Sequence, residues 1–167
     1  MSYLDTSVII AYCIEGDPHH DKAVKVIEKL KEKNKLYASA LTLVELYSWL
    51  SRNIQKYRLP PGIEEVMDYE GKLRLTVTYC LQSLPIQIFS DEVKLTSIGE
   101  LKLFHKFSEA INLAAKLKLR TLDLLHITYI IQLAEKEHVK LFVTFDSDIL
   151  NKKEIIQKYT GIWIVSE

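Results

Sequence analysis

Short apolar runs alternate along the chain with longer stretches in which apolar residues recur at helical spacing. The runs that have the length and composition of strands are Tyr3–Leu4, Leu36–Ala38, Ile86–Phe89, Leu141–Thr144 and Ile162–Val165. Each run is separated from the next by enough chain for a helix, and such long connections are what parallel strands require. Because these crossovers are right-handed, the pattern predicts an α/β layered domain in which helices cover a parallel sheet.

The intervening stretches carry helix signals of their own. Helices are expected directly after Asp17-Pro18, over about 40–55, around 63–81, within 91–119 and over about 122–138. Asp17 and Ser39 are the expected caps of the first two, with Pro18 at the first helical position, and the breaker PPG precedes the third. The last stretch contains LDLLHITYII and is apolar almost all round, so we expect it to lie centrally against the sheet.

Composition favours one soluble, globular unit. The chain has 167 residues, of which 48% are hydrophobic, and this length predicts a single domain over 1–167. The 22 Lys and Arg residues balance the 22 Asp and Glu residues, so a nucleic-acid partner would have to meet a local patch. Cys13 and Cys80 lie in apolar stretches and are expected to be buried thiols of a cytoplasmic protein. The sequence predicts neither a signal peptide nor a membrane span.

Two aspartates directly follow predicted strands. Asp5 comes after the first strand, in YLDTSVII, and Asp146 comes just after the strand that ends at Thr144, in LFVTFDSDIL. In an open parallel sheet, ligands bind at the carboxyl ends of the strands. If the two strands are neighbours, both carboxylates face one crevice. The alternative is that each aspartate only caps the helix that follows it.

Two further acids interrupt apolar helix faces. Glu45 is four residues from both Leu41 and Trp49, so it shares their stripe. Asp123 lies in the first turn of the most apolar helical stretch, and an unpaired carboxylate in either position is costly. Glu45 could instead pair with a Lys or Arg, and Asp123 could interact only with the helix dipole, with Thr121 as the cap.

Taken together, the four acids predict a site for divalent cations. Two like charges about 4 Å apart repel by on the order of 4 kcal/mol at an effective dielectric constant near 20, so several carboxylates cannot share a pocket in the ionised state without compensation. Either some of them stay protonated, or cations bind. Carboxylate oxygens suit Mg²⁺ or Mn²⁺. Such a site is suited to phosphodiester hydrolysis, in which the metal neutralises the phosphate and activates a water.

Four segments carry these acids in a characteristic order: YLDTSVIIAY, SALTLVELYSWL, LRTLDLLHITYIIQLA and LFVTFDSDIL. In that order they resemble the PIN-domain nucleases, and most closely the VapC-type toxins of prokaryotic toxin–antitoxin pairs. The resemblance covers nearly the whole chain. It implies a three-layer α/β/α PIN-like fold with a central parallel sheet of four or five strands. It also implies Mg²⁺- or Mn²⁺-dependent endoribonuclease activity on an RNA substrate, an antitoxin partner and a homodimer.

The resemblance also assigns roles to individual residues. The catalytic and metal-binding acids of the family fall on Asp5, Glu45, Asp123 and Asp146, and Asp148 ranks below them as a further ligand. The hydroxyl groups expected to support these acids or to position water are those of Thr6, Ser7 and Thr144. His126 follows the third acid by three residues, and we expect it to be a hydrogen-bonded core residue rather than a ligand.

The chain departs from the shorter VapC-type pattern in an enlarged helical segment at about 52–85. Its basic residues could form a surface for RNA phosphates or could be ordinary solvated positions: Arg52, Lys56, Arg58, Lys72 and Arg74. Aromatic residues near the acids are expected to be core or dimer contacts rather than base-stacking platforms, because no basic residues interleave with them: Tyr3, Tyr12, Tyr47 and Trp49.

Two other functions remain open at this point. One is a PIN nuclease of RNA processing or DNA cleavage, and the other is a non-catalytic PIN-like binding module. A phosphatase of the haloacid dehalogenase type is excluded. Although FDSDIL contains Asp-x-Asp after a strand, too little chain follows Asp146 for the remaining parts of such a site.

Overall fold

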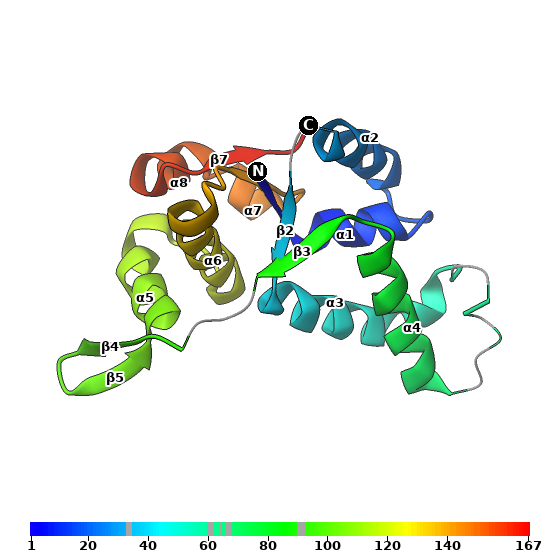
Figure 1. Ribbon diagram of the computed structural model, residues 1–167, viewed down its shortest axis with the longest axis horizontal. Helices are drawn as coiled ribbons and strands as arrows, with labels where there is room; N and C mark the ends of the chain where they lie inside the picture. The colour runs from blue at the N-terminus through cyan, green and yellow to red at the C-terminus, as the bar shows by residue number, and fades with distance from the viewer. Residues whose placement is uncertain (33–34, 60–61, 64, 66–67, 90–92) are drawn as a thin grey trace.

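Five parallel strands form the central sheet of the computed structural model, in the order β3-β2-β1-β6-β7 (Figure 1). The strands are β1 (Ser2–Leu4), β2 (Leu36–Ser39), β3 (Ile86–Phe89), β6 (Leu141–Val143) and β7 (Trp163–Val165). All five fall on the apolar runs, so the predicted parallel sheet is confirmed. The structure describes the chain apart from residues 33–34, 60–61, 64, 66–67 and 90–92.

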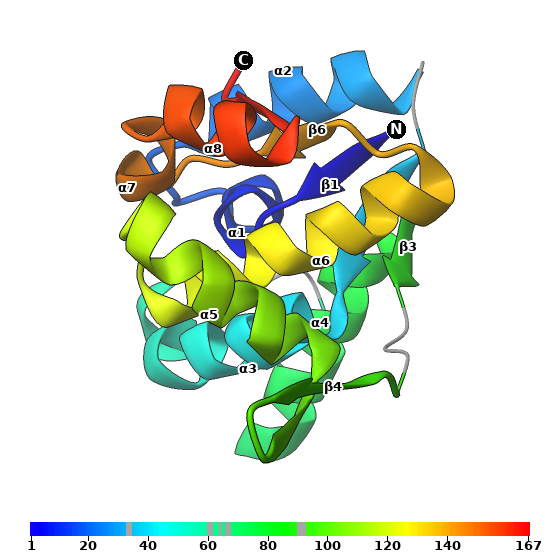
Figure 2. The same ribbon diagram turned by 90° about the vertical axis from the view of Figure 1, so that its left-hand side faces the viewer.

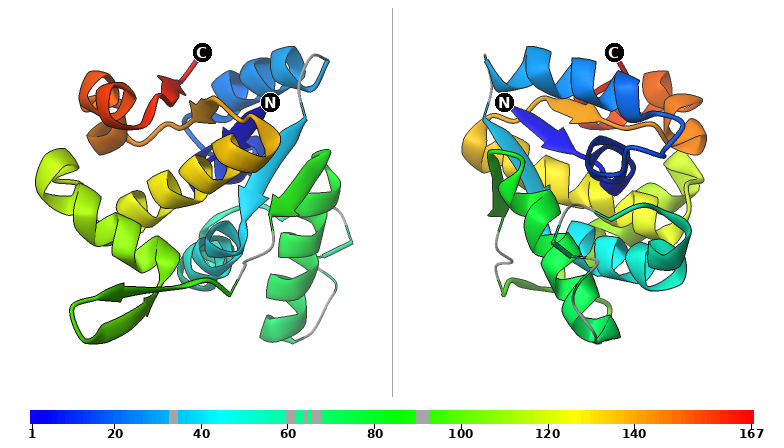
Figure 3. Two further views of the ribbon diagram at one scale, coloured as in Figure 1. Left: turned by 60° about the vertical axis from the view of Figure 1, so that its left-hand side comes forward. Right: turned by 90° about the vertical axis from the view of Figure 1, so that its right-hand side faces the viewer.

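Helices cover both faces of this sheet. One layer contains α1 (Thr6–Cys13), α2 (His20–Lys31), α3 (Ala40–Asn53) and α4 (Tyr69–Gln82). The other contains α5 (His105–Leu117), α6 (Thr121–Glu137), α7 (Ser147–Leu150) and α8 (Lys153–Thr160). Figure 2 faces the layer of α5 and α6, and the right panel of Figure 3 faces the layer of α1 and α4. The predicted three-layer α/β/α architecture is therefore confirmed.

Each face of the sheet has its own apolar core. Successive residues of a strand point to opposite faces. Leu4 therefore packs with Leu46 in the core beneath α1 to α4, whereas its neighbour Tyr3 packs with Ile127 and Phe142 in the core beneath α5 to α8. α6 is buried along most of its length because it lies between the sheet and α5, which explains why its sequence is apolar almost all round.

The sheet grows in two directions from β1. The chain first adds β2 and β3 on one side of β1 and later returns to add β6 and β7 on the other side. β1 and β6 are direct neighbours, with Tyr3 opposite Phe142. In parallel α/β sheets, a crevice forms at the carboxyl ends of the strands at such a switch point. The condition set for Asp5 and Asp146, that their strands be neighbours, is met.

Two helix starts differ from the prediction. α2 begins at His20, after Pro18, and the carboxylate of Asp17 instead accepts a hydrogen bond from the backbone N–H of His19 (2.8 Å) in the preceding turn. α4 begins at Tyr69, later than expected, because Asp68 is its cap. The breaker residues 60–61 lie outside the described residues.

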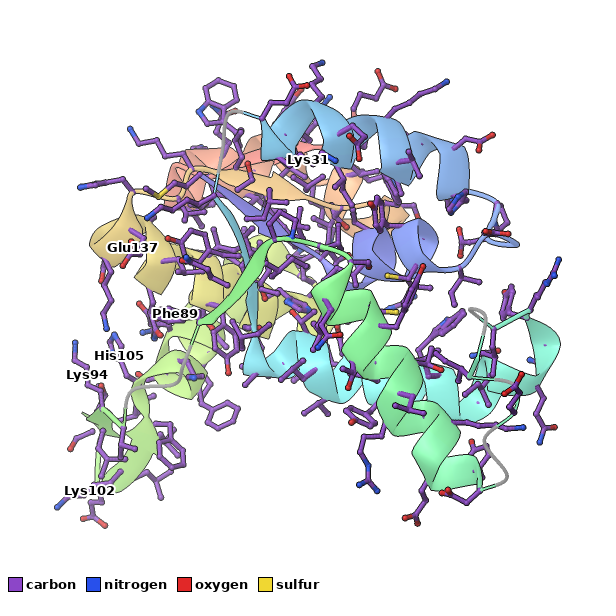
Figure 4. All side chains as sticks on the ribbon, turned by 45° about the vertical axis from the view of Figure 1, so that its right-hand side comes forward. Lys31, Phe89, Lys94, Lys102, His105 and Glu137 are labelled. Atoms are coloured by element: carbon purple, nitrogen blue, oxygen red, sulfur yellow. The ribbon has the colours of Figure 1, made fainter. Side chains whose placement is uncertain are left out.

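A β-hairpin stands in the segment where only helices were expected. β4 (Leu95–Ile98) and β5 (Leu101–Phe104) pair antiparallel and lead directly into α5. Gly99 at their turn has a φ of 58°, the left-handed conformation that a two-residue hairpin turn needs, and this glycine was the signal that the helical interpretation overlooked. The N–H of His105 donates to the carbonyl of Lys94 (2.8 Å) at the base of the hairpin, and Lys102 lies near its far end (Figure 4).

Two smaller expectations concern the cysteines and the membrane. Cys13 and Cys80 are buried free thiols, as expected. Among the helices of the described residues, none combines the length and the apolar character needed to cross a membrane. The segment 52–85 contributes a short 3-10 helix at Ile54–Lys56 and α4, which packs against α3.

Candidate metal centre

Asp5 and Asp146 lie at the carboxyl ends of two neighbouring strands. The backbone N–H of Asp5 donates to the carbonyl of Val143 (2.9 Å), which continues the pairing of β1 with β6. Each aspartate also caps the next helix. Asp5 accepts from the N–H of Thr6 (2.9 Å), and Asp146 accepts from the N–H of Asp148 (2.7 Å). The capping interpretation and the shared-crevice interpretation are therefore both correct, because a carboxylate oxygen that accepts one hydrogen bond can still accept another or bind a cation.

Three hydroxyl groups contact the carboxylates, and they belong to the residues that the family resemblance had pointed to, Thr6, Ser7 and Thr144. Ser7 Oγ and Thr144 Oγ1 donate to Oδ2 of Asp5 over 2.6 and 2.7 Å. Thr6 Oγ1 donates to Oε2 of Glu45 over 2.5 Å. Asp5, Thr6 and Thr144 are buried, so these hydrogen bonds hold the acids in fixed orientations.

Glu45 has a buried histidine as its partner rather than a Lys or Arg. His126 Nε2 lies 2.8 Å from Oε2 of Glu45 and 3.7 Å from Oδ1 of Asp5. On the other side of the ring, Nδ1 lies 2.8 Å from the hydroxyl of Tyr3, which in turn lies 2.7 Å from Oγ of Ser39. His126 is thus the hydrogen-bonded core residue that was expected, and it also reaches the carboxylates.

The charges of Glu45 and His126 compensate each other. Burial by itself would raise the pKa of Glu45, but the hydrogen bond and charge of His126, together with the hydroxyl of Thr6, outweigh burial and lower this pKa. Burial would likewise lower the pKa of His126, but Glu45 and the charge of Asp5 raise it. His126 and Glu45 therefore stabilise each other's charged forms.

Asp123 is only partly compensated: burial and neighbouring charges raise its pKa, and the charge of His126 and a backbone hydrogen bond at Arg120 lower the pKa without offsetting that rise. Its Oδ2 is buried and finds no hydrogen-bond partner among the residues that the structure describes. Burial, followed by the charges of Asp146 and Asp5, raises the pKa of Asp123 from 3.8 to about 6. A buried carboxylate oxygen without a donor, next to two other carboxylates, is the arrangement expected where a cation completes the site.

All four predicted acids line one cavity of about 560 Å³: Asp5, Glu45, Asp123 and Asp146. Leu41 and Trp49 line it too, as expected for the stripe that they share with Glu45. Asp148 does not, because its carboxylate lies 3.1 Å from Nη2 of Arg120 in a separate depression. The structure thus unites four acids and leaves the fifth outside.

The donor set fits a divalent cation. One ligand atom from each of Asp5, Glu45 and His126 lies within 4.8 Å of the other two, and Asp123 adds its unpaired oxygen to the same cavity. Carboxylate oxygens suit Mg²⁺ or Mn²⁺, whereas Nε2 of His126 could bind a cation only as a neutral imidazole released from Glu45. Sequence reasoning gave His126 only a structural role. The Asp-x-x-His spacing, which places both side chains on one face of α6, was the signal that His126 lies beside the acids.

Comparison with known proteins agrees with this geometry. Residues 2–155 match the family model described as PIN domain, so the chain belongs to the PIN domain family. Its fold is similar to that of the Mycobacterium tuberculosis toxin VapC20, which cleaves the sarcin-ricin loop, with a TM-score of 0.59, 13% identity, and coverage of 90% of this chain and 94% of that one. A comparison with curated proteins found no match.

Two solved assemblies contain the same fold. VapBC2 from Rickettsia felis, bound to a DNA fragment from its promoter, aligns over 99% of this chain and 98% of the other, with a TM-score of 0.58 and 16% identity. A toxin–antitoxin complex from Klebsiella pneumoniae aligns over 89% of this chain and 90% of the other, with a TM-score of 0.52 and 13% identity. At these identities the similarity establishes the PIN-like fold that the sequence predicted.

Proposed function

We propose that the chain is a Mg²⁺- or Mn²⁺-dependent endoribonuclease and the toxin of a toxin–antitoxin pair. The observation that carries this proposal is the cavity in which four carboxylates meet while Oδ2 of Asp123 has no donor among the described residues. Membership in the PIN domain family and the fold shared with VapC20, a toxin that cleaves the sarcin-ricin loop, support it.

The cation would be held by Asp5, Glu45, Asp123 and Asp146, with His126 beside them. When bound, it would supply charge neutralisation at the phosphodiester and an activated water. The protein's own hydrogen-bonding groups hold the carboxylates in position. Ser7 and Thr144 keep the Asp5 carboxylate aimed into the cavity.

Thr6 and His126 perform the same task for Glu45. Because these hydrogen bonds are made before any substrate arrives, the acids need little rearrangement to receive a cation and a phosphate.

The nuclease assignment is tested with Asp5→Asn and Asp123→Asn in an RNA cleavage assay with Mn²⁺, Mg²⁺ or a chelator. Cleavage by the wild type should require the metal, and each variant should lose the cleavage activity. Asp148→Asn is the matched control, because this acid is paired with Arg120 outside the cavity and should keep wild-type activity. Cleavage by both cavity variants at the wild-type rate contradicts the assignment.

Metal binding can be measured separately from cleavage. A cation that binds only the folded state must raise the midpoint of thermal unfolding, and at 100 times its dissociation constant the gain is about 2.7 kcal/mol. Millimolar Mn²⁺ should therefore stabilise the wild type and Asp148→Asn but not Asp123→Asn. A stabilised protein that cleaves no RNA would support the alternative of a binding module, and one that cleaves only DNA would support another class of PIN nuclease.

The partner assignments are part of the same proposal. The assemblies from Rickettsia felis and Klebsiella pneumoniae support an antitoxin partner. We expect the antitoxin to occlude the acidic cavity, so RNA cleavage should be lost on co-expression with the product of a small neighbouring gene. A homodimer and a cytoplasmic location follow from the family resemblance. We also propose that residues 1–167 fold as a single domain with an enlarged segment at 52–85. Light scattering tests the dimer, and a single cooperative unfolding transition tests the domain.

A further inference from the structure

Exposed apolar side chains gather on the β4–β5 hairpin and on the adjoining turns of α5. Leu95 and Leu101 are 57% and 65% exposed, and four neighbours that follow or lie between them are also exposed. None of these residues belongs to the apolar core on either face of the central sheet. We call the whole set the hairpin patch: Leu95, Ile98, Leu101, Phe104, Phe107 and Ile111.

The hairpin presents apolar side chains on both of its faces. Leu95 stands directly opposite Phe104, and Ile98 stands directly opposite Leu101, so the members of each pair share a face. Successive residues of a strand alternate between faces, and Leu95 and Ile98 are three residues apart, so the two pairs lie on opposite faces. A hairpin that lay flat on its own domain would bury one of these faces.

The patch continues from the hairpin onto α5. The rings of Phe104 and Phe107 have centroids 6.3 Å apart, with the planes at 59°. Phe107 and Ile111 are one helical turn apart, so they lie on the same side of α5. The hairpin itself stands beyond α5, away from the central sheet (Figures 1 and 2). The patch is therefore a continuous surface at one end of the molecule.

The hairpin lacks the cover that small sheets need. In the part of the chain that the structure describes, β4 and β5 pair only with each other. Two strands alone are marginally stable in water, and a third strand or an apolar cover is needed. α5 supplies part of this cover at the base of the hairpin, where Oγ1 of Thr96 lies 2.9 Å from Nδ1 of His105. A second protein surface would supply the rest.

The charges around the patch are mixed in sign. Lys94 and Lys102 are exposed beside it, and so is Glu100 at the hairpin turn. A surface that binds RNA would be basic throughout, and one that binds a basic peptide would be acidic. In a twofold-symmetric dimer each surface meets a copy of itself, so a patch of one sign would repel its copy, whereas opposite charges on one patch can pair across the axis.

The area of the patch also matches a homodimer. A fully exposed large apolar side chain offers about 150 Å², so six that are about half exposed offer about 450 Å². A standard interface buries about 800 Å² on each partner, and about 65% of a homodimer interface is apolar, which corresponds to about 500 Å² of apolar surface. The hairpin patch is thus about as large as the apolar part of such an interface.

We propose that two copies of this chain form a twofold-symmetric dimer through the hairpin patch, each contributing its hairpin and the adjoining side of α5. This inference rests on the homodimer of the proposed function and assigns an interface to it. It does not depend on cleavage. In such a dimer the partner copy covers the face of the hairpin that α5 leaves open.

Sedimentation equilibrium of the full chain tests this interface. The wild type should dimerise reversibly. A Leu101→Lys, Ile111→Lys double variant changes two exposed positions and should raise the dissociation constant at least about 100-fold, because each change removes apolar contact from both halves of the interface. Leu75→Lys is the matched control, because Leu75 is exposed on α4 outside the patch, and it should dimerise like the wild type.

Folding of the variants can be checked independently of dimerisation. The double variant should keep the circular dichroism spectrum of the wild type and its thermal stabilisation by Mn²⁺, because neither substituted residue lines the acidic cavity.

Amide hydrogen exchange of the wild type tests the interface without any substitution. Dilution from about 100 µM to about 1 µM should dissociate the dimer and speed exchange in β4, β5 and the first turns of α5, while exchange in β1 and β6 should not change. Dissociation that leaves exchange in the hairpin unchanged overturns the proposal.

The outcomes for the interface and for the proposed function are distinguishable. A double variant that dimerises as tightly as the wild type overturns the hairpin patch but not the homodimer. A wild type that is monomeric at every concentration overturns both, and the nuclease assignment is unaffected. Slower exchange in the hairpin that appears only when the product of the small neighbouring gene is added assigns the patch to the antitoxin and overturns the proposal. A monomeric double variant that cleaves RNA supports the interface and the nuclease together.

Discussion

The carboxylate of Asp123 should destabilise the metal-free protein, and Asp123→Asn should therefore stabilise it at neutral pH. The folded protein raises the pKa of this group from 3.8 to about 6, first by burial and then through the charges of Asp146 and Asp5. The folded state therefore binds the proton more tightly than the unfolded state does. As the pH rises through the window between these two values, folding must give up that proton, and stability falls.

The size of the effect follows from the same two pKa values. One pKa unit corresponds to about 1.4 kcal/mol, so the rise from 3.8 to about 6 amounts to about 3 kcal/mol if the site were dry. Asp123 is only partly buried, and solvent screening reduces this figure to about 1 to 1.5 kcal/mol. In a chain of this length, such a change shifts the midpoint of thermal unfolding by about 2 to 5 °C.

Urea unfolding in the presence of a chelator, at about pH 4 and at pH 7.5, measures this prediction. Asp123→Asn should be nearly equal to the wild type at the lower pH and more stable by the stated amount at the higher pH, with an unchanged m-value. Asp148→Asn, whose parent carboxylate is exposed and paired with Arg120, should show no such gain. With saturating Mn²⁺ the order should reverse. An asparagine variant that is no more stable than the wild type at pH 7.5 refutes the reasoning.

Three further predictions concern neighbouring contacts. His126→Gln removes the imidazole 2.8 Å from Glu45 and should weaken Mn²⁺ binding, measured by calorimetry, by about 10-fold to 100-fold; unchanged affinity would show that His126 neither binds the cation nor orients Glu45. Thr144→Val removes the donor to the buried Asp5 and should cost about 1 to 3 kcal/mol in chemical unfolding, whereas Thr144→Ser should restore the hydrogen bond and most of the stability. Gly99→Val places a β-branched residue at a φ of 58° and should cost about 1 to 2 kcal/mol, with faster amide exchange confined to β4 and β5; a neutral effect would contradict the turn geometry.

Much of the site could be predicted because its acids carry local signals. Asp5 and Asp146 directly follow strands, and Glu45 and Asp123 interrupt apolar helix faces, so each was conspicuous in the sequence. Their convergence needed one further fact, that β1 and β6 are neighbours, which only the strand order supplies. Asp148 carries a similar local signal, but its position in α7 turns it toward Arg120, and residue type did not reveal this.

The partners of these acids were harder to foresee. The contact between His126 and Glu45 joins residues 81 positions apart, and the one between Thr144 and Asp5 joins residues 139 positions apart. The hydroxyls of Thr6, Ser7 and Thr144 were expected from the family pattern rather than from spacing. The hairpin at 95–104 was missed because its strands are short, and a four-residue strand has too few positions to be distinguished from a helix by period alone.

The sequence by itself determined the alternation of strands and helices, the two-sided burial of the sheet and the identity of four acids that do not belong in apolar surroundings, because periodicity and residue type express local preferences. The tertiary structure alone decided which strands are neighbours, which carboxylate oxygen finds no donor among the described residues and which rings border the cavity. The rings of His19 and Phe145 contact each other although the two residues are far apart in the chain, and Lys22 lies near the same Phe145 ring. Those contacts depend on the order in which the strands pair, and no local pattern records that order.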